Sequence, residues 1–258
     1  MIKEEVKFQN SVVFEGMTSI RAIIKANEEG INDRRISKIL FDKDKKKKNA
    51  KELGYFRAVS DIKGFELVEA TAEEIEKITL GTSHGGIIAI CEERTIPSLT
   101  NSTDIKKNGF YCMIQGIEDP YNFGYTVRSL YAAGVDGIVL PPRNWMNAAG
   151  VVARASAGTS EMIPMFVAPS DEVAEYFHQR SYQILCAGIR DSVSIFEKSF
   201  QFPVLLVIGG EKRGISRNIL NSADQIVRID YGRSFRGSLC ASAAAAVLAF
   251  ALFEQNKS

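Results

Sequence analysis

Apolar and polar positions alternate in blocks over the second half of the chain. Six short apolar runs, each four to six residues long and bounded by polar or turn-forming residues, are typical of buried strands. Longer amphipathic segments between them predict helices. Strands that alternate with helices in this way form a mostly parallel sheet with helices on both faces. The predicted strands are 110–115, 136–140, 162–167, 183–187, 204–208 and 226–229, and the predicted helices are 122–133, 144–155, 171–180, 216–221 and 238–254.

The first hundred residues have a different pattern. Helical and strand-like segments are shorter and more mixed, which predicts a smaller α+β domain. Residues 98–108 are polar and rich in turn formers, as in a linker. We therefore expect one domain at 1–97, a linker at 98–108 and a larger α/β domain at 109–258. Helices are predicted at 19–29, 45–53 and 73–78, and strands at 37–41, 64–68 and 86–90.

Composition narrows the class of protein. The chain has 258 residues, of which 45% are hydrophobic and 24% charged, as in an ordinary globular protein. The net charge of +1 gives no evidence for a nucleic-acid partner. Basic residues are nevertheless concentrated, because nine of them lie between Arg34 and Lys51 with only two acidic residues. This run is either a solvated helix face or a contact for RNA phosphates, and its candidate contacts are Lys45, Lys46, Lys47 and Lys48.

The four cysteines are scattered along the sequence, without the close pairs of a zinc site, and indicate a reducing cytoplasm and no metal. Residues 1–10 lack the uncharged stretch of a signal peptide. The longest apolar run, 241–253, is too short to span a bilayer and is rich in alanine. We expect a cytoplasmic protein with no membrane contact, in which this run is a packed helix.

Three segments carry residues suited to ligand chemistry. The first, 119–129, follows a predicted strand and opens a helix, with Asn122 at a position suited to capping and Arg128 six residues later. Arg128 can bind a phosphate with two hydrogen bonds. The simpler interpretation is that Asn122 only caps the helix and that Arg128 pairs with a surface acid.

The second segment is a glycine-rich turn after the predicted strand 204–208, in which Gly209 and Gly210 precede Glu211 and Gly214. Glycines allow close backbone approach and expose amide donors to a ligand, although such a turn is also a common tight connection. Its late position differs from that of a dinucleotide-binding fold, where the glycine turn follows the first strand. This position argues against a nucleotide-binding oxidoreductase.

The third segment, 229–243, leaves a strand through a loop with two arginines and two glycines and enters an alanine-rich helix at Ser238. A helix N-terminus attracts anions, although an ordinary capped helix would have the same sequence.

In this order, the three segments resemble the motifs of the TrmH branch of the SPOUT superfamily, the RNA ribose 2′-O-methyltransferases. The similarity covers residues 109–254, and residues 155–159 with Ile163 and Pro164 also look like the family. More weakly, the first hundred residues resemble the L30e-like RNA-binding domain that is often fused to it. The matching motif positions are Asp119, Pro120, Asn122, Gly124, Arg128, Ser129, Gly209, Glu211, Gly214, Ile229, Ser238 and Leu239.

The resemblance implies a fold, a cofactor and partners. It implies a deep trefoil knot at the C-terminal end of the α/β domain, an exception to the rule that chains do not thread. It further implies S-adenosylmethionine as the cofactor, ribosomal or transfer RNA as the substrate, and a homodimer formed through the knotted domain. The implied catalytic residues are Arg128, Asn122, Glu211 and Ser238, with Arg128 also contacting RNA. The implied cofactor contacts are Gly209, Gly210, Gly214, Ile229, Ser238, Leu239 and Cys240.

Two positions depart from the family pattern. Asp230 occupies the place of a proline, and Cys240 that of an asparagine. A thiol is a poor substitute for an amide that both donates and accepts hydrogen bonds. The leading interpretation is a methyltransferase, and the alternative is a non-catalytic RNA-binding or ribosome-assembly factor that keeps the knotted fold.

Overall fold

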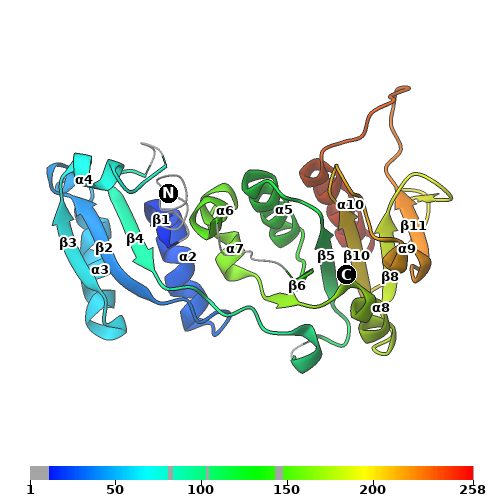
Figure 1. Ribbon diagram of the computed structural model, residues 1–258, viewed down its shortest axis with the longest axis horizontal. Helices are drawn as coiled ribbons and strands as arrows, with labels where there is room; N and C mark the ends of the chain where they lie inside the picture. The colour runs from blue at the N-terminus through cyan, green and yellow to red at the C-terminus, as the bar shows by residue number, and fades with distance from the viewer. Residues whose placement is uncertain (1–11, 81–83, 103–104, 143–147, 258) are drawn as a thin grey trace, which may run out of the picture. The chain divides into compact units, whose positions relative to one another are not determined.

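A computed structural model describes residues 12–80, 84–102, 105–142 and 148–257 of the chain (Figure 1). It divides into two compact units, here called unit 1 (1–95 with 144–162) and unit 2 (96–143 with 163–258). The chain therefore passes from one unit to the other three times. These units differ from the domains expected from sequence, because 98–108 belongs to unit 2 and 144–162 belongs to unit 1.

Unit 2 is built on a parallel sheet, as the alternating pattern predicts. The strand order is β7-β6-β5-β10-β8-β11-β9, and every pairing among the described strands is parallel. The strand β10 comes late in the sequence, yet it lies between β5 and β8 in the sheet. The strands are β5 (Phe110–Gln115), β6 (Gly137–Leu140), β7 (Met165–Val167), β8 (Gln183–Ala187), β9 (Val193–Ser194), β10 (Val204–Gly209) and β11 (Gln225–Arg228).

Both faces of this sheet are buried, which explains the continuous apolar runs. Side chains alternate between the two faces, so that Tyr111 and Met113 of β5 pack in one cluster with Tyr176 and Phe177 of α8. On the other face, α10 packs against β10 and α5. The helices are α5 (Pro120–Ala132), α8 (Ser170–His178), α9 (Arg217–Asn221) and α10 (Ala241–Gln255), and a short 3-10 turn, η2, spans Leu99–Asn101. No helix in the described ranges is long and apolar enough to cross a membrane.

The starts of α5 and α10 differ from the sequence prediction. Asp119, not Asn122, caps α5, since its carboxylate accepts the Asn122 backbone N–H at 2.7 Å. Proline at the first helical position makes this earlier start favourable. The helix α10 begins at Ala241 after Cys240, without a side-chain cap, so Ser238 is not its N-cap either.

Unit 1 has a mixed four-stranded sheet with the order β1-β4-β2-β3. Apolar side chains of the sheet pack against α2 and α3, and Ala149 and Ala153 of α6 join the same core cluster. The strands are β1 (Val13–Glu15), β2 (Ile36–Asp42), β3 (Glu66–Ala70) and β4 (Ile87–Cys91). The helices are α2 (Gly16–Glu28), α3 (Ala50–Lys63), α4 (Ala72–Glu76), α6 (Ala149–Ala155) and α7 (Thr159–Met162).

The helix predicted at 45–53 is wrong in its first turn. Residues Lys43–Lys45 form a 3-10 turn, η1, and α3 begins only at Ala50. The Asp42 carboxylate caps this turn by accepting the Asp44 backbone N–H at 3.0 Å. The predicted helix 144–155 is observed from Ala149 onward, and residues 143–147 lie outside the described part of the chain.

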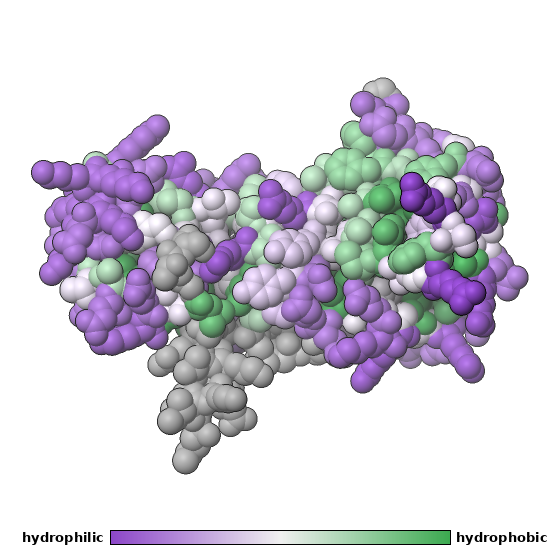
Figure 2. All heavy atoms as spheres, turned by 90° about the horizontal axis from the view of Figure 1, so that it is seen from above, coloured by the Kyte–Doolittle hydropathy of each residue, from purple (hydrophilic) through white to green (hydrophobic). Residues whose placement is uncertain are grey.

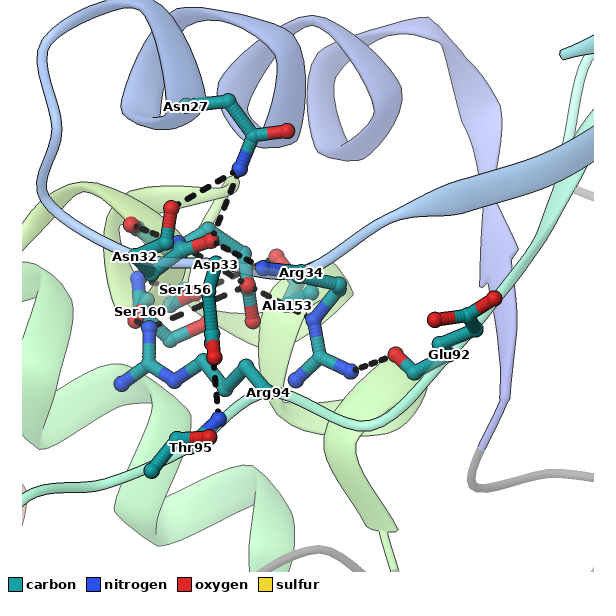
Figure 3. Close-up of polar contacts among 11 residues, drawn as sticks. Asn27, Asn32, Asp33, Arg34, Glu92, Arg94, Thr95, Ala153, Ser156 and Ser160 are labelled. Atoms are coloured by element: carbon teal, nitrogen blue, oxygen red, sulfur yellow. Dashed lines mark hydrogen bonds and ion pairs between the residues drawn. The ribbon is translucent and has the colours of Figure 1, made fainter. Parts of the chain in front are cut away.

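A buried ionic cluster holds α7 within unit 1 (Figure 3). The Glu161 side chain is 3% exposed, and its carboxylate accepts a hydrogen bond from Arg34 Nε at 2.8 Å. Arg34 also donates to the Glu92 carbonyl at 2.8 Å. Arg94 lies 3.8 Å from the same carboxylate and donates to the Ser160 carbonyl at 3.0 Å. Burial lowers the pKa of Arg94, so the Glu161 carboxylate is the counterion on which both guanidinium groups depend.

Further contacts join α6 and α7 to the first 95 residues. The Asn32 amide donates to the Glu161 carbonyl at 2.6 Å, and Arg154 of α6 forms an ion pair of 2.7 Å with Glu15. Gly158, in the turn between α6 and α7, lies so close to α2 that a Cβ atom there would be 2.5 Å from the Ala22 Cβ. The hairpin of α6 and α7 is thus packed as part of unit 1.

We expect Glu161→Gln to lower the free energy of unfolding by about 3–5 kcal/mol, because it removes the buried carboxylate that the Arg34 and Arg94 guanidinium groups share. Urea unfolding of the full chain measures this change. The control is Glu73→Gln, which removes an exposed ion pair with Lys77 and should cost less than about 1 kcal/mol. Equal effects of the two substitutions would contradict the assignment.

Candidate active site

The carboxyl ends of β5 and β10 meet at a tight glycine turn. These strands are neighbours with Gly209 opposite Gln115, and the Gly210 N–H donates to the Gln115 carbonyl at 2.6 Å. The turn closes on itself where the Gly214 N–H donates to the Gly210 carbonyl at 2.9 Å. In parallel α/β sheets, ligands bind at this carboxyl edge of the strands.

Glycine is required in this turn because the backbones touch. A Cβ atom on Gly210 would lie 2.0 Å from the Gly116 carbonyl oxygen, and one on Gly209 would lie 2.5 Å from the Gly214 carbonyl carbon. At Gly214 the backbone conformation favours glycine, because its φ of +61° lies in the left-handed region that other residues rarely adopt. The turn after β10 is therefore more than a connection, since it is pressed against the end of β5.

Gln115 is a positioning residue that the sequence analysis did not single out. Its side chain is buried, and its amide oxygen accepts the Ser216 backbone N–H at 2.8 Å. Its amide nitrogen donates to the Ser170 hydroxyl at 2.7 Å. Gln115 thus ties the end of β5 to the starts of α8 and α9. A polar amide at the end of the apolar run 110–115 was the available signal.

Two cavities lie on either side of the glycine turn and share Gly210, Glu211 and Ala241. The smaller, about 110 Å³, lies against the start of α5, and Glu118 and Lys212 on its wall form an ion pair of 3.5 Å. The larger, about 220 Å³, lies between the glycine turn, β11 and α10. The larger cavity is lined by Ala187, Gly188, Ile189, Ile208, Gly209, Gly210, Glu211, Gly214, Ile215, Val227, Arg228, Ile229, Tyr231, Ser238, Leu239, Ala241, Ala244 and Leu248.

Most of the site residues expected from sequence gather around these cavities. Asn122 and Glu211 line the smaller one, although they come from segments 89 positions apart in the chain. Because Asp119 caps α5, the Asn122 side chain is not used for capping. The expected residues that line the larger cavity are Gly209, Gly210, Glu211, Gly214, Ile229, Ser238 and Leu239.

Arg128 and Cys240 are not brought into either cavity. Arg128 is exposed on α5, and its six-residue spacing from Asn122 turns it by about 240° around the helix axis. Among the described residues Arg128 forms no ion pair, so the pairing with a surface acid that the simpler interpretation expects is not observed there. Cys240 is exposed at the start of α10, where the Ser242 hydroxyl and nearby backbone amides lower the pKa of its thiol.

The candidate RNA-contacting lysines lie in unit 1. Lys45 is 3.4 Å from the Asp42 carboxylate, and Lys46 pairs with Glu69. Lys47 and Lys48 are exposed, and neither forms an ion pair within the described ranges. Hydrophilic side chains cover much of the end of unit 1 that carries β2 and β3 (Figure 2). Lys47 and Lys48 are therefore the members of the run most available to a phosphate.

Comparison with known proteins decides the family. Residues 109–250 match the SpoU rRNA Methylase family. All residues that line the two cavities lie within this range. The chain belongs to this family. It is an RNA methyltransferase, and the similarity to the TrmH branch drawn from its motifs is confirmed.

Individual relatives of this SpoU family protein are only moderately similar. It is 27% identical over 184 residues to the 23S rRNA (guanosine-2′-O-)-methyltransferase RlmB of Shewanella oneidensis, covering 69% of this chain and 73% of that protein. It is 31% identical over 145 residues to a putative TrmH family tRNA/rRNA methyltransferase of Staphylococcus saprophyticus, covering 56% of this chain and 58% of that protein.

Solved structures share the fold of this SpoU family member. An AdoMet-bound rRNA methyltransferase from Sinorhizobium meliloti superposes with a TM-score of 0.79 at 20% identity, covering 100% of this chain and 95% of the other. An RNA 2′-O ribose methyltransferase superposes with a TM-score of 0.77 at 22% identity, covering 94% and 88%. At these identities, the likeness establishes the α/β fold with its mostly parallel sheet.

We expect Gly210→Ala to lower the free energy of unfolding by about 1–3 kcal/mol, because the new methyl group overlaps the Gly116 carbonyl and forces the two strand ends apart. Urea unfolding measures the change. Gly232→Ala is the control, since a Cβ atom there meets nothing within 4 Å and its φ needs no glycine. A harmless Gly210→Ala would show that the close approach is not required.

Proposed function

We propose that this SpoU family member transfers a methyl group from S-adenosylmethionine to a ribose 2′-hydroxyl of ribosomal or transfer RNA. The observation that carries the proposal is the convergence of the three motif segments on the two adjoining cavities. Relatives named as guanosine-2′-O-methyltransferases of 23S rRNA, and structural neighbours solved with AdoMet, support it.

The larger cavity fits S-adenosylmethionine in its chemistry. Apolar side chains, among them Ile189, Leu239 and Leu248, suit the adenine ring, and the close-packed glycine turn presents backbone groups to a ligand. Glu211 is exposed and lines both cavities. Its carboxylate is the acidic group on the wall of the larger cavity that can attract a cationic sulfonium. When bound, the cofactor supplies an electrophilic methyl group for in-line transfer to the hydroxyl oxygen.

The chain's own residues must orient the ribose and stabilise its charge as the hydroxyl loses its proton. Asn122 is suited to hydrogen-bond the ribose, because its amide lines the smaller cavity. Arg128 is a poor base, since the pKa of a free guanidinium is above about 12. Its role here is to bind the adjacent phosphate through two hydrogen bonds. Ser238 supplies a further polar group on the wall of the larger cavity.

A homodimer through the knotted domain would reconcile the placement of Arg128 with this role. Arg128 is exposed on α5 and does not line the cavities of its own chain, so it would reach the cavity of a partner copy. The exposed aromatic rings of Tyr121 and Tyr125 on α5 and of Phe250 on α10 supply an apolar surface for that contact.

The proposal includes the trefoil knot and a cytoplasmic location. Support for the knot comes from the insertion of β10 between β5 and β8 and from the return of α10 against β10 and α5. We further propose that residues 1–97 are an L30e-like domain that binds the RNA substrate. Its mixed four-stranded sheet and the exposed lysines beside η1 support this assignment.

The test of the activity uses radiolabelled S-adenosylmethionine and total RNA. We expect the full chain to label RNA at ribose 2′-oxygens and Arg128→Lys to bind RNA within about threefold of normal while transfer falls by about two orders of magnitude, because the bidentate phosphate contact is lost. The control is Arg217→Lys, an exposed arginine on α9. RNA binding without any transfer by the unsubstituted chain would instead support the non-catalytic alternative, for which Cys240 in place of asparagine is the motivating observation.

The lysine run is tested by salt dependence. We expect Lys47→Gln with Lys48→Gln to reduce the slope of log affinity against log salt by about 1.4 for a single-stranded RNA, since each phosphate contact contributes about 0.7. Lys45→Gln with Lys46→Gln should reduce it less, because these two side chains already pair with acidic residues. An unchanged slope in both double variants would remove the run from the RNA-binding surface.

A further inference from the structure

The loop between β11 and α10 projects from the rest of unit 2 (Figure 1). Seven consecutive residues of it, from Tyr231 to Gly237, are exposed to solvent. The stretch combines aromatic rings and arginines with small residues, in the order Tyr231, Gly232, Arg233, Ser234, Phe235, Arg236 and Gly237. None of the roles assigned above uses its two arginines or its phenylalanine.

Phe235 is held in a defined place although it is exposed. Its side chain is 58% exposed, and its ring centre lies 5.7 Å from that of Tyr231. The ring also lies over Gly237, where a Cβ atom would be 2.5 Å from it. Tyr231 is fixed in turn, because its hydroxyl accepts the Leu239 backbone N–H at 3.2 Å. The loop therefore presents an aromatic face to solvent instead of burying it.

The charge beside this ring is positive and uncompensated. Arg233 and Arg236 flank Phe235, and neither forms an ion pair with any described residue. The nearest acidic residue in the loop, Asp230, accepts a hydrogen bond from Arg228 at 2.8 Å and is thereby engaged. A fixed, exposed ring between two free guanidinium groups is the combination that binds single-stranded nucleic acid, with bases stacked on the ring and phosphates on the cations.

The loop also forms part of the wall of the larger cavity. Tyr231, Ser238 and Leu239 line that cavity, and Tyr231 is the residue that contacts Phe235. At the right-hand end of Figure 2, where unit 2 is seen from above, strongly hydrophilic side chains are interspersed with hydrophobic ones. A strand bound at Phe235 would therefore lie at the rim of the cavity proposed for the cofactor.

We propose that the loop 231–237 is an RNA-binding element in which an unpaired base stacks on Phe235 while Arg233 and Arg236 bind the neighbouring phosphates. This inference rests on the proposed function for its choice of RNA. The occupant is single-stranded, because the ring of a base inside a duplex is covered by its neighbours and cannot stack on a side chain. A protein partner is disfavoured by the small residues and charges around the ring, which offer little apolar area for an interface core.

The test measures binding of the full chain to a fluorescein-labelled oligouridine of about 16 nucleotides and to an RNA duplex of equal length. We expect Phe235→Ala to raise the Kd for the single strand about tenfold, Phe235→Trp to restore it, and the duplex to change less than about twofold. Arg233→Ala with Arg236→Ala should reduce the salt slope by about 1.4. The matched controls are Phe196→Ala, a loop phenylalanine of the same unit that is 59% exposed, and the exposed Arg190→Ala.

Two further measurements separate this inference from the proposed function. Calorimetry with S-adenosylmethionine should give the same affinity for Phe235→Ala as for the unsubstituted chain, which shows that the cavity is intact. Light scattering should give the same mass. Unchanged single-strand binding in Phe235→Ala overturns the inference, as does a lower mass, which would make the ring a contact between two copies. If the unsubstituted chain transfers no methyl group while its RNA binding still depends on Phe235, the inference stands and the proposed activity falls.

Discussion

The architecture of unit 2 depends on one close contact between backbones, that of Gly210 with Gly116. There is no room for a side chain at Gly210, whose Cβ atom would lie 2.0 Å from the Gly116 oxygen. The contact sets the distance between the ends of β5 and β10. The hydrogen bonds of Gln115 then hold the starts of α8 and α9 against the end of β5. Both cavities share Gly210, so a single steric constraint shapes two cavities at once.

The sequence predicts the sheet of unit 2 well because burial leaves a strong signal. A parallel strand covered on both faces is apolar along most of its length, and the runs from Phe110 to Ile114 and from Val204 to Ile208 show this pattern. The sequence predicts helix starts less well. Asp119 and Asn122 are both good capping residues, and only the position of Pro120 and the tertiary contacts choose between them. The strands β1 and β9 have three and two residues, too few for any periodicity to show.

The sequence predicts the glycines of the candidate site and only part of its polar arrangement. Asn122 and Glu211, which the resemblance assigns to one site, both line the smaller cavity. Arg128 lies on another face of α5, and this follows from its six-residue spacing from Asn122 within one helix and not from where the helix begins. For Gln115 the sequence offers only a polar residue at the end of an apolar run, and its importance appears only with the hydrogen bonds that its side chain forms with Ser170 and Ser216.

The three passages of the chain between the units mean that unit 1 is built from two separate segments of the sequence. The hairpin of α6 and α7 is locked into unit 1 by Glu161, yet its two ends continue directly into the segments that join β6 and β7. Residues 1–95 are consequently not a detachable module, because their removal would expose Ala149 and Ala153 to solvent and take Arg34 away from the Glu161 carboxylate.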